Sequence, residues 1–294
     1  MTLQQLVYFH TACRHGNLSR AAEELHVSQP SISAAIKNLE NEFGVSLIRR
    51  RSTGFVLTEE GETLCELAQG LISHADRVTA VMAQNGSGRR TVRLGMPPMA
   101  GAILLPRIYA EFCAAHPEVE LSTVESGRGG LLEQLDDNRL DMAFLAHAEA
   151  FSPQYKSVPV TQYETVCCVS PAHPLAGEMV VRVAQLKDQP LVFFSKGFFQ
   201  NERIGALCAQ AGVEPLVMHT SSQLSTVTQL IRSNIAAGFL FREVAQKEAD
   251  MVGIPLDPPV YTNISLVWKK DRYLGDSARA FIEYVKAMTA ENEK

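Results

Sequence analysis

Hydrophobic residues in the first 58 positions recur at the spacing of three short helices. The first apolar run predicts a helix that ends at Gly16. Ser19 and Ser28 are the expected N-caps of a second and a third helix, whose first turn tolerates Pro30. The third helix carries one apolar stripe, formed by Ile32, Ala35, Ile36 and Leu39. Two helices joined by a tight turn predict a helix-turn-helix.

A hairpin and a long helix are expected next. Residues 47–58 predict a two-stranded wing with a basic tip, and Thr58 is the expected cap of the helix that follows. Along that helix, apolar residues recur near a seven-residue period at Leu64, Leu67, Leu71, Val78 and Met82. Such a stripe predicts pairing with a second copy of the chain, and the alternative is a helix that packs only on its own domain. Residues 85–90 have the composition of a linker.

From residue 91 onward, strand-like and helix-like segments alternate. Strands are expected at 91–96, 119–125, 142–146, 191–194, 217–220 and 237–241. Helices are expected at 101–115, 130–135, 201–211 and 224–233. This alternation predicts a parallel, doubly wound sheet in two α/β lobes.

Composition narrows the class of protein. The chain has 294 residues, of which 46 % are apolar and 20 % charged, as is usual for globular proteins. Its apolar runs are far shorter than the roughly 20 residues that a membrane-spanning helix needs. The N-terminus has no basic region followed by an apolar one, so we expect a cytoplasmic protein without a membrane partner. The six cysteines are scattered and are expected to be free thiols.

Charge is unevenly distributed. Residues 1–58 carry six basic and four acidic residues, a net charge of +2. The net charge of the whole chain is −5, so the remaining residues carry −7. A basic head on an acidic body suggests that only the head meets a polyanion. The alternative is that the basic residues form an ordinary solvated surface.

The segment 19–33, SRAAEELHVSQPSIS, is the most specific motif, and LTEEG at 57–61 extends it. Weaker motifs follow at 92–95, 116–117, 140–143, 173–175 and 211–215. In these residues the chain resembles the LysR-type transcriptional regulators over its full length. The resemblance implies an α+β multidomain fold: an N-terminal winged helix-turn-helix, a long linker helix, and a two-lobed α/β effector domain like periplasmic binding proteins.

The resemblance also implies the domain bounds and the function. Residues 1–58 would bind DNA, 59–90 would form the dimerisation helix and hinge, and 91–294 would bind an effector. The first lobe would comprise about 91–163 and 269–294, and the second about 164–268. The function implied is sequence-specific DNA binding controlled by a small molecule bound in the cleft between the lobes.

In such a head, the second helix of the motif presents its first turn to the major groove. The expected DNA-binding residues are Ser28, Gln29, Pro30, Ser31, Ser33 and Lys37 in the helix and Arg49, Arg50 and Arg51 in the wing. Ser28 could instead be only a helix cap, and Arg50 could brace the wing internally. Ala34 stands where many relatives carry a basic residue, which favours readout of DNA shape over direct base contacts.

The resemblance places effector contacts in loops at the cleft. The expected residues are Pro98, Met99, Ala100, Gly101, Arg128, Phe194, Ser195, Lys196, Ser222 and Gln223. Arg128 could hold a carboxylate or phosphate with two hydrogen bonds, and Lys196 could add a second charge, unless both lie on exposed loops. Met99 stands where relatives often keep Ser or Thr, which favours a more apolar effector. Four phenylalanines, Phe193, Phe194, Phe198 and Phe199, could line that pocket or belong to the core.

The expected partners are double-stranded DNA with a partly palindromic operator and further copies of the chain as a dimer of dimers, with RNA polymerase as a candidate. No metal or other cofactor is expected. An enzyme is disfavoured because no phosphate loop, nucleophile elbow or metal-spaced cluster occurs. A thiol-based redox sensor is the second alternative, although Cys208 is expected to be buried and Cys167 and Cys168 to face opposite sides of a strand. The third alternative is a protein that only binds a solute, and the DNA-binding segment at 1–58 argues against it.

Overall fold

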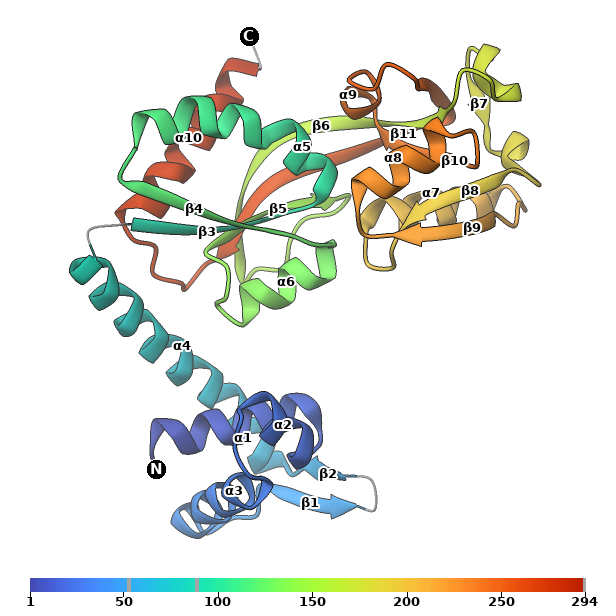
Figure 1. Cartoon of the computed structure of the whole chain (residues 1–294). Helices are drawn as coiled ribbons and strands as arrows, with labels where there is room; N and C mark the ends of the chain where they lie inside the picture. The colour runs from blue at the N-terminus through green and yellow to red at the C-terminus, as the bar shows by residue number, and fades with distance from the viewer. Residues whose placement is uncertain (52–53, 88–89, 293–294) are drawn as a thin grey trace. The chain divides into compact units, whose positions relative to one another are not determined.

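The computed structural model describes residues 1–51, 54–87 and 90–292, which form two compact units, Met1–Gly86 and Ser87–Lys294. The first unit contains three helices, a hairpin and the long helix expected after it (Figure 1). These elements are α1 (Leu3–His15), α2 (Leu18–Glu24), α3 (Gln29–Phe43), β1 (Ile48–Arg51), β2 (Gly54–Leu57) and α4 (Glu59–Ser87). We call this unit the head and the second unit the body.

Each helix of the head begins with a side chain that accepts a backbone N–H. Ser28 accepts the N–H of Ser31 at 3.3 Å, so the predicted cap of α3 is confirmed. The cap predicted at Ser19 is wrong, because Asn17 caps α2 instead. Its Oδ1 accepts the N–H groups of Ser19 at 2.8 Å and Arg20 at 3.2 Å. A side-chain oxygen in this position satisfies N–H groups that the helix itself cannot.

The core of the head joins α1, α2, α3 and the start of α4. Phe9, Ile32 and Leu39 are fully buried in it, together with Ala68 of α4. The predicted wing is confirmed as the antiparallel pair β1 and β2, while its tip, 52–53, lies outside the described residues.

Helix α4 continues through Ser87, so the linker predicted from 85 does not begin there, and 88–89 lie outside the described residues. Leu64 is half-buried against the head core and therefore does not belong to an exposed stripe. The other four residues of the predicted period are between 49 % and 64 % exposed. They are Leu67, Leu71, Val78 and Met82, which we call the α4 stripe.

The body is built on a nine-stranded sheet with the order β4-β3-β5-β11-β6-β10-β8-β9, in which β7 pairs with β11 (Figure 1). The strands are β3 (Arg90–Met96), β4 (Val119–Glu125), β5 (Met142–His147), β6 (Tyr155–Val169), β7 (Val181–Arg182), β8 (Pro190–Phe194), β9 (Leu216–Ser221), β10 (Ala237–Phe241) and β11 (Val252–Lys269). The helices are α5 (Pro98–Ile108), α6 (Arg128–Asp136), α7 (Phe199–Gln210), α8 (Leu224–Arg232), α9 (Arg242–Ala245) and α10 (Asp276–Asn292). Shorter turns are η1 (Tyr109–Cys113), η2 (Pro174–Gly177) and η3 (Val183–Leu186).

Two long antiparallel strands, β6 and β11, connect the two lobes of the body. Within each lobe the other strands are parallel, so the sheet is mixed and not wholly parallel as predicted. Strand β6 pairs with β10 of the second lobe from Thr165, near the predicted boundary at 164. Strand β11 pairs with β5 of the first lobe from Asn263 to Val267.

Alternate residues of each strand contact opposite helical layers. Phe144 and Phe194 belong to the core under α5, α8, α9 and α10, whereas Leu145 packs with α6 and Phe193 with α7. Cys168 and Cys167 likewise lie in these two different cores, so the prediction that they face opposite sides is confirmed. Over the described residues, no helix combines the length and the apolarity needed to cross a bilayer.

Candidate DNA-binding surface and effector pocket

The outer face of α3 carries small and polar side chains. Pro30, Ser31, Ala34 and Lys37 are exposed along one side of the helix, opposite the buried Ile36. This spacing of one, three and three residues places the four side chains on neighbouring turns of one face. With these mostly small side chains facing outward, α3 can lie in the major groove of DNA.

The other expected DNA contacts lie around this face. The hydroxyl of Ser28 lies 2.8 Å from that of Ser31, so Ser28 takes part in the start of α3 and also lies beside this exposed face. Gln29 and Ser33 are half-buried. Arg49 and Arg51 are exposed on β1, and the side chain of Arg50 lies outside the described residues.

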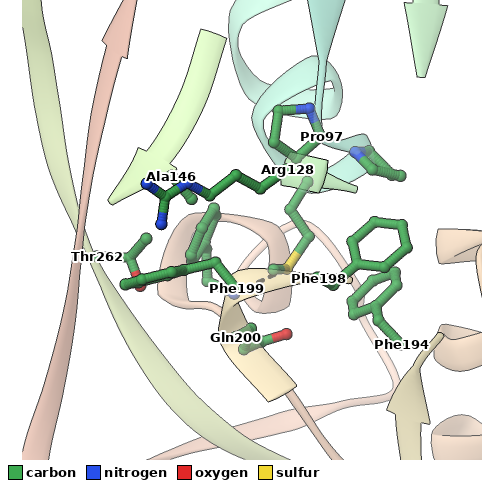
Figure 2. Close-up of a pocket in the computed structure, with 11 residues that line it drawn as sticks. Pro97, Arg128, Ala146, Phe194, Phe198, Phe199, Gln200 and Thr262 are labelled. Carbon is green, nitrogen blue, oxygen red and sulfur yellow. Dashed lines mark hydrogen bonds between the residues drawn. The ribbon is translucent and has the colours of Figure 1, made fainter. Parts of the chain in front are cut away.

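A small cavity of about 30 Å³ lies between the two lobes of the body (Figure 2). It is lined by Pro97, Pro98, Met99, Arg128, Ala146, Phe194, Phe198, Phe199, Gln200, Phe241 and Thr262, and we call it the inner pocket. Strands β5, β8, β10 and β11 supply Ala146, Phe194, Phe241 and Thr262, while the first turns of α5, α6 and α7 and the residues directly before α5 and α7 supply the others.

Aromatic and thioether groups make up most of the wall of the inner pocket. The rings of Phe194 and Phe198 stack with their centroids 5.1 Å apart. Phe241 stacks on Tyr163 at 4.9 Å, and its backbone N–H donates to Sδ of Met99 at 3.3 Å. Because Met99 belongs to the first lobe and Phe241 to the second, this hydrogen bond ties the two lobes together.

Three polar groups of the inner pocket are buried without a partner. Among the described residues, nothing forms a hydrogen bond with Nε of Arg128, Nε2 of Gln200 or Oγ1 of Thr262. In Figure 2 the guanidinium of Arg128 extends toward the side of the pocket where Thr262 lies, away from Phe194 and Phe198. It also lies 5.9 Å from the ring centroid of Phe151. Each buried group left unsatisfied costs about 1–3 kcal/mol, so a group that supplies its partner gains that energy.

Three helices begin at the inner pocket without a side-chain cap. The residues before α5, α6 and α7 are Pro97, Gly127 and Phe198, and within the described ranges none of them caps its helix with a side-chain hydrogen bond. The first N–H groups of a helix favour negative charge. Together with Arg128, they make this end of the pocket suited to an anion.

A larger hollow of about 380 Å³ opens beside the inner pocket. We call it the outer hollow, and it is lined by Glu125, Ser126, Gly127, Gly130, Lys196, Gly197, Phe198 and Ser222. The lobes meet here, because a Cβ atom on Gly127 would lie only 2.6 Å from the carbonyl oxygen of Gly197. Glycine at 127 therefore permits the close approach of the two lobes.

Two family models match the chain, one over the head and one over the body. The model of the bacterial regulatory helix-turn-helix protein, lysR family, matches residues 3–62, and the LysR substrate binding domain model matches residues 85–290. The chain belongs to the LysR family of transcriptional regulators. It is therefore a DNA-binding regulator with an effector-binding domain, and the predicted resemblance and fold class are confirmed.

Individual relatives cover nearly all of this LysR-type regulator. It is 30 % identical to the uncharacterized HTH-type transcriptional regulator YwbI of Bacillus subtilis over 100 % of this chain and 99 % of that protein. It is 29 % identical to the hydrogen peroxide-inducible genes activator of Dickeya chrysanthemi, over 81 % and 77 % of the two chains. The solved structure of HinK, a LysR family regulator of Pseudomonas aeruginosa, is 25 % identical with a TM-score of 0.58, and the match covers 98 % of each chain.

The effector residues expected for this LysR-type regulator divide between the two hollows. Pro98, Met99, Arg128 and Phe194 line the inner pocket, and Lys196 and Ser222 line the outer hollow. The remaining ones line neither: Ala100 and Gly101 are buried in α5, Ser195 accepts a hydrogen bond from Ser222 at 3.0 Å, and Gln223 precedes α8. Of the four phenylalanines, Phe193 is core on the opposite face of the sheet, and the other three line the pocket.

Among the lining residues that the sequence analysis does not name are Ala146, Gln200 and Thr262. Ala146 and Thr262 come from strands β5 and β11, which meet only through long-range pairing. Gln200 was missed because helix α7 begins at Phe199, two residues earlier than predicted.

The other chemistry considered for this LysR-type regulator finds little support in the body. Burial raises the pKa of the Cys167 thiol to about 12 and also raises the pKa values of Cys168 and Cys208, which disfavours reactive thiolates there. Among the residues that the structure describes, no group of three His, Cys, Asp or Glu side chains is placed to hold a metal ion.

Proposed function

We propose that this regulator responds to a small, mainly apolar molecule with one anionic group, for which an aryl carboxylate is the simplest class. One observation carries the proposal: three unpartnered polar groups line a cavity whose other walls are aromatic or aliphatic. Ligand pockets commonly combine an apolar wall with a few converging polar groups.

The chemistry of the lining assigns a role to each group. The guanidinium of Arg128 pairs with the carboxylate, and the N–H groups at the starts of α6 and α7 add to the positive potential. The amide of Gln200 and the hydroxyl of Thr262 supply further hydrogen bonds. Phe199 and Phe241 contact the aromatic ring.

The size of the cavity links binding to movement of the lobes. A cavity of about 150 Å³ holds benzene, whereas the inner pocket measures about 30 Å³. An aryl carboxylate therefore enters only when Phe198 swings away or the contact between Gly127 and Gly197 opens. Because the ligand binds one lobe arrangement better than the other, it shifts the balance between them and so alters operator binding.

Assembly is the second part of the proposal. The α4 stripe pairs with the same stripe of another copy, so that two heads meet a partly palindromic operator in the cytoplasm, and two such dimers join. RNA polymerase is the candidate contact of the assembled complex on DNA. The effector is bound without being converted, in keeping with the family, whose members are transcriptional regulators.

The test is calorimetric titration of the full chain with benzoate, benzyl alcohol and acetate. Benzoate should bind at least about tenfold more tightly than the other two, because a charge-assisted hydrogen bond contributes about 1.5–3 kcal/mol. Arg128→Ala should remove this preference, whereas Arg139→Ala, at an exposed arginine paired with Asp137, should not. Equal affinity for benzoate and benzyl alcohol would contradict the anionic class, and unchanged binding in Arg128→Ala would remove Arg128 from the site.

A further inference from the structure

The turn between α3 and the wing is organised by one residue, Glu40. This residue lies in the last turn of α3, and its backbone carbonyl accepts the N–H groups of Gly44 and of Val45, the latter at 3.2 Å. Its carboxylate accepts the N–H groups of Leu47 at 2.8 Å and Ile48 at 3.4 Å. A single residue of α3 therefore fixes both the end of that helix and the start of β1.

Helix α4 and the residue before it also hold the chain at the start of β1. The N–H of Thr58 donates to the carbonyl of Leu47 at 3.1 Å, and the Thr58 hydroxyl donates to the carbonyl of Ser46 at 2.6 Å. A Cβ atom on Gly61 would lie only 2.1 Å from the carbonyl oxygen of Leu47, so α4 meets this backbone at close range. The base of the wing is thus held between α3 and α4, and Glu40 supplies hydrogen bonds from the α3 side.

The negative charge of Glu40 by itself weakens DNA binding. A carboxylate repels the phosphates of DNA, and at the C-terminal end of a helix it is also disfavoured by the helix dipole. The N–H groups of Leu47 and Ile48 offset this cost within the head, because a hydrogen bond to an ionised group is about twice as strong as one between neutral groups. Any gain in DNA affinity from Glu40 must therefore come from the geometry that it imposes on the wing.

We propose that Glu40 is a positioning residue for DNA binding, which holds the wing so that Arg49 and Arg51 meet the DNA backbone while α3 lies in the major groove. Both arginines are exposed on β1, directly after the backbone that the carboxylate holds. Because they are two residues apart in a strand, they lie on one face of the wing. This role belongs to the head alone and is independent of the effector and its pocket.

The sign of the effect of Glu40→Ala separates positioning from simple charge. If the carboxylate acts only through its charge, its removal tightens DNA binding. If it positions the wing, its removal releases the start of β1, phosphate contacts are lost, and binding weakens. Because log K falls with log salt with a slope of about 0.9 for each phosphate contact, one lost contact lowers the affinity about eightfold at 0.1 M salt relative to 1 M.

The experiment compares full-length variants on a duplex that the wild-type chain has selected from a random library. Fluorescence anisotropy at several salt concentrations gives the affinity and its salt slope, and hydroxyl-radical footprinting gives the protected backbone positions. Glu40→Ala should bind about five- to tenfold more weakly at 0.1 M salt, with a shallower slope. It should lose the protections that Arg49→Gln also loses and keep those that only Lys37→Gln removes.

Three further variants isolate the hydrogen bonds of the carboxylate. Glu40→Gln removes the charge but keeps an oxygen that accepts N–H groups, so it should retain the wing protections. Glu40→Asp keeps the charge on a side chain one methylene shorter, so it should lose these protections as Glu40→Ala does. Glu23→Ala removes a charge from an exposed position of α2 and should leave the footprint unchanged.

Loss of folding and loss of positioning give different results. A less stable head lowers the active fraction, which stoichiometric titration measures, but the molecules that bind keep the wild-type salt slope and footprint. A Glu40→Ala variant that binds DNA at least as tightly as the wild type, or more weakly with an unchanged slope and footprint, would overturn the positioning role. If Glu40→Ala yields no folded head, the comparison rests on the other two substitutions. Loss of the wing protections in Glu40→Gln with their retention in Glu40→Asp would then assign the effect to charge and overturn the role, as would an Arg49→Gln footprint equal to that of the wild type.

Discussion

Helix starts differ between the head and the body. In the head, Thr2, Asn17, Ser28 and Thr58 each accept a backbone N–H at the start of α1, α2, α3 and α4. In the body, α5, α6, α7 and α8 start without a side-chain cap in the described residues, and the first three of these starts line the inner pocket. Side chains satisfy the first N–H groups of these helices in the head, whereas in the body no side chain of the described residues caps these four starts.

One buried threonine in each unit shows the same difference. Thr58 of the head donates to the carbonyl of Ser46 at 2.6 Å and accepts the N–H of Gly61 at 3.0 Å. Thr262 of the body is as well buried, yet its hydroxyl has no partner among the described residues. Unsatisfied polar groups reduce stability and are commonly retained where a ligand completes them. The satisfied hydroxyl of Thr58 stabilises the start of α4, whereas the unsatisfied hydroxyl of Thr262 faces the inner pocket, where a ligand can supply its partner.

The largest expected effect concerns the α4 stripe, which we assign to pairing of two heads. Leu71→Asp would place a charge in that apolar contact, and loss of the second head should weaken operator binding by about 10²–10⁴. Effector binding by the body should remain unchanged. Sedimentation and anisotropy measure the two results, with Thr79→Asp on another face of α4 as the matched control. A Leu71→Asp variant that sediments as the wild type would exclude the stripe from the contact.

The next prediction separates two kinds of DNA contact made by the head, contacts with bases and contacts with phosphates. Gln29→Ala should weaken operator binding by about 1–3 kcal/mol, the contribution of one bidentate base contact. Lys37→Gln should instead weaken binding to all sequences and lower the salt dependence, since phosphate contacts release counterions. Titrations at several salt concentrations separate the two. An unchanged footprint and affinity in Gln29→Ala would remove Gln29 from the recognition surface.

The head was predictable because its signals are local. Ser28, the stripe from Ile32 to Leu39, and the wing all lie within short stretches of chain, where caps and periodicity decide the structure. The wrong cap at Ser19 arose because Asn17 and Ser19 are both good capping residues, and only the geometry of the turn selects Asn17. Asn234, after α8 in the body, has a φ of 54°, a left-handed conformation that asparagine tolerates at the end of a helix.

The inner pocket was predictable only in part, because its walls meet through long-range pairing. The strands of each lobe were identified from their apolar runs, but the shared antiparallel strands β6 and β11 were not predicted over their full length. Thr262 enters the pocket only because β11 crosses between the lobes there. Arg128 and Phe194 came from the family resemblance, whereas Gln200 needed the true start of α7.

A matched pair of substitutions tests the difference between the hydroxyls directly. Thr58→Val should destabilise the head by about 1–2 kcal/mol, because it removes a cap and leaves N–H of Gly61 unsatisfied. Thr262→Val should stabilise the body by up to about 1 kcal/mol, because it removes an unsatisfied group. Hydrogen exchange in α3 and α4 reports the first, and fluorescence of Trp268, the single tryptophan, reports unfolding of the body. Destabilisation of the body by Thr262→Val would show that its hydroxyl is satisfied after all.

The smallest effect is a difference in acid sensitivity. Burial lowers the pKa of His147 in the body, where its Nε2 lies 2.8 Å from the hydroxyl of Ser265, so the unfolded chain takes up a proton that the folded body resists. Stability from this group is present above 6.5, the ordinary pKa of histidine, and falls as the pH drops below that value. In the head, hydrogen bonds from His15 and Arg14 lower the pKa of Glu24, so that contribution is lost only below 4.5. Acidification from neutral pH should therefore weaken the body before the head.

Urea unfolding followed by Trp268 fluorescence should show this loss of stability of the body between pH 7 and pH 5, and His147→Gln should flatten the pH dependence. An equally steep profile in that variant would assign the acid sensitivity of the body to other groups.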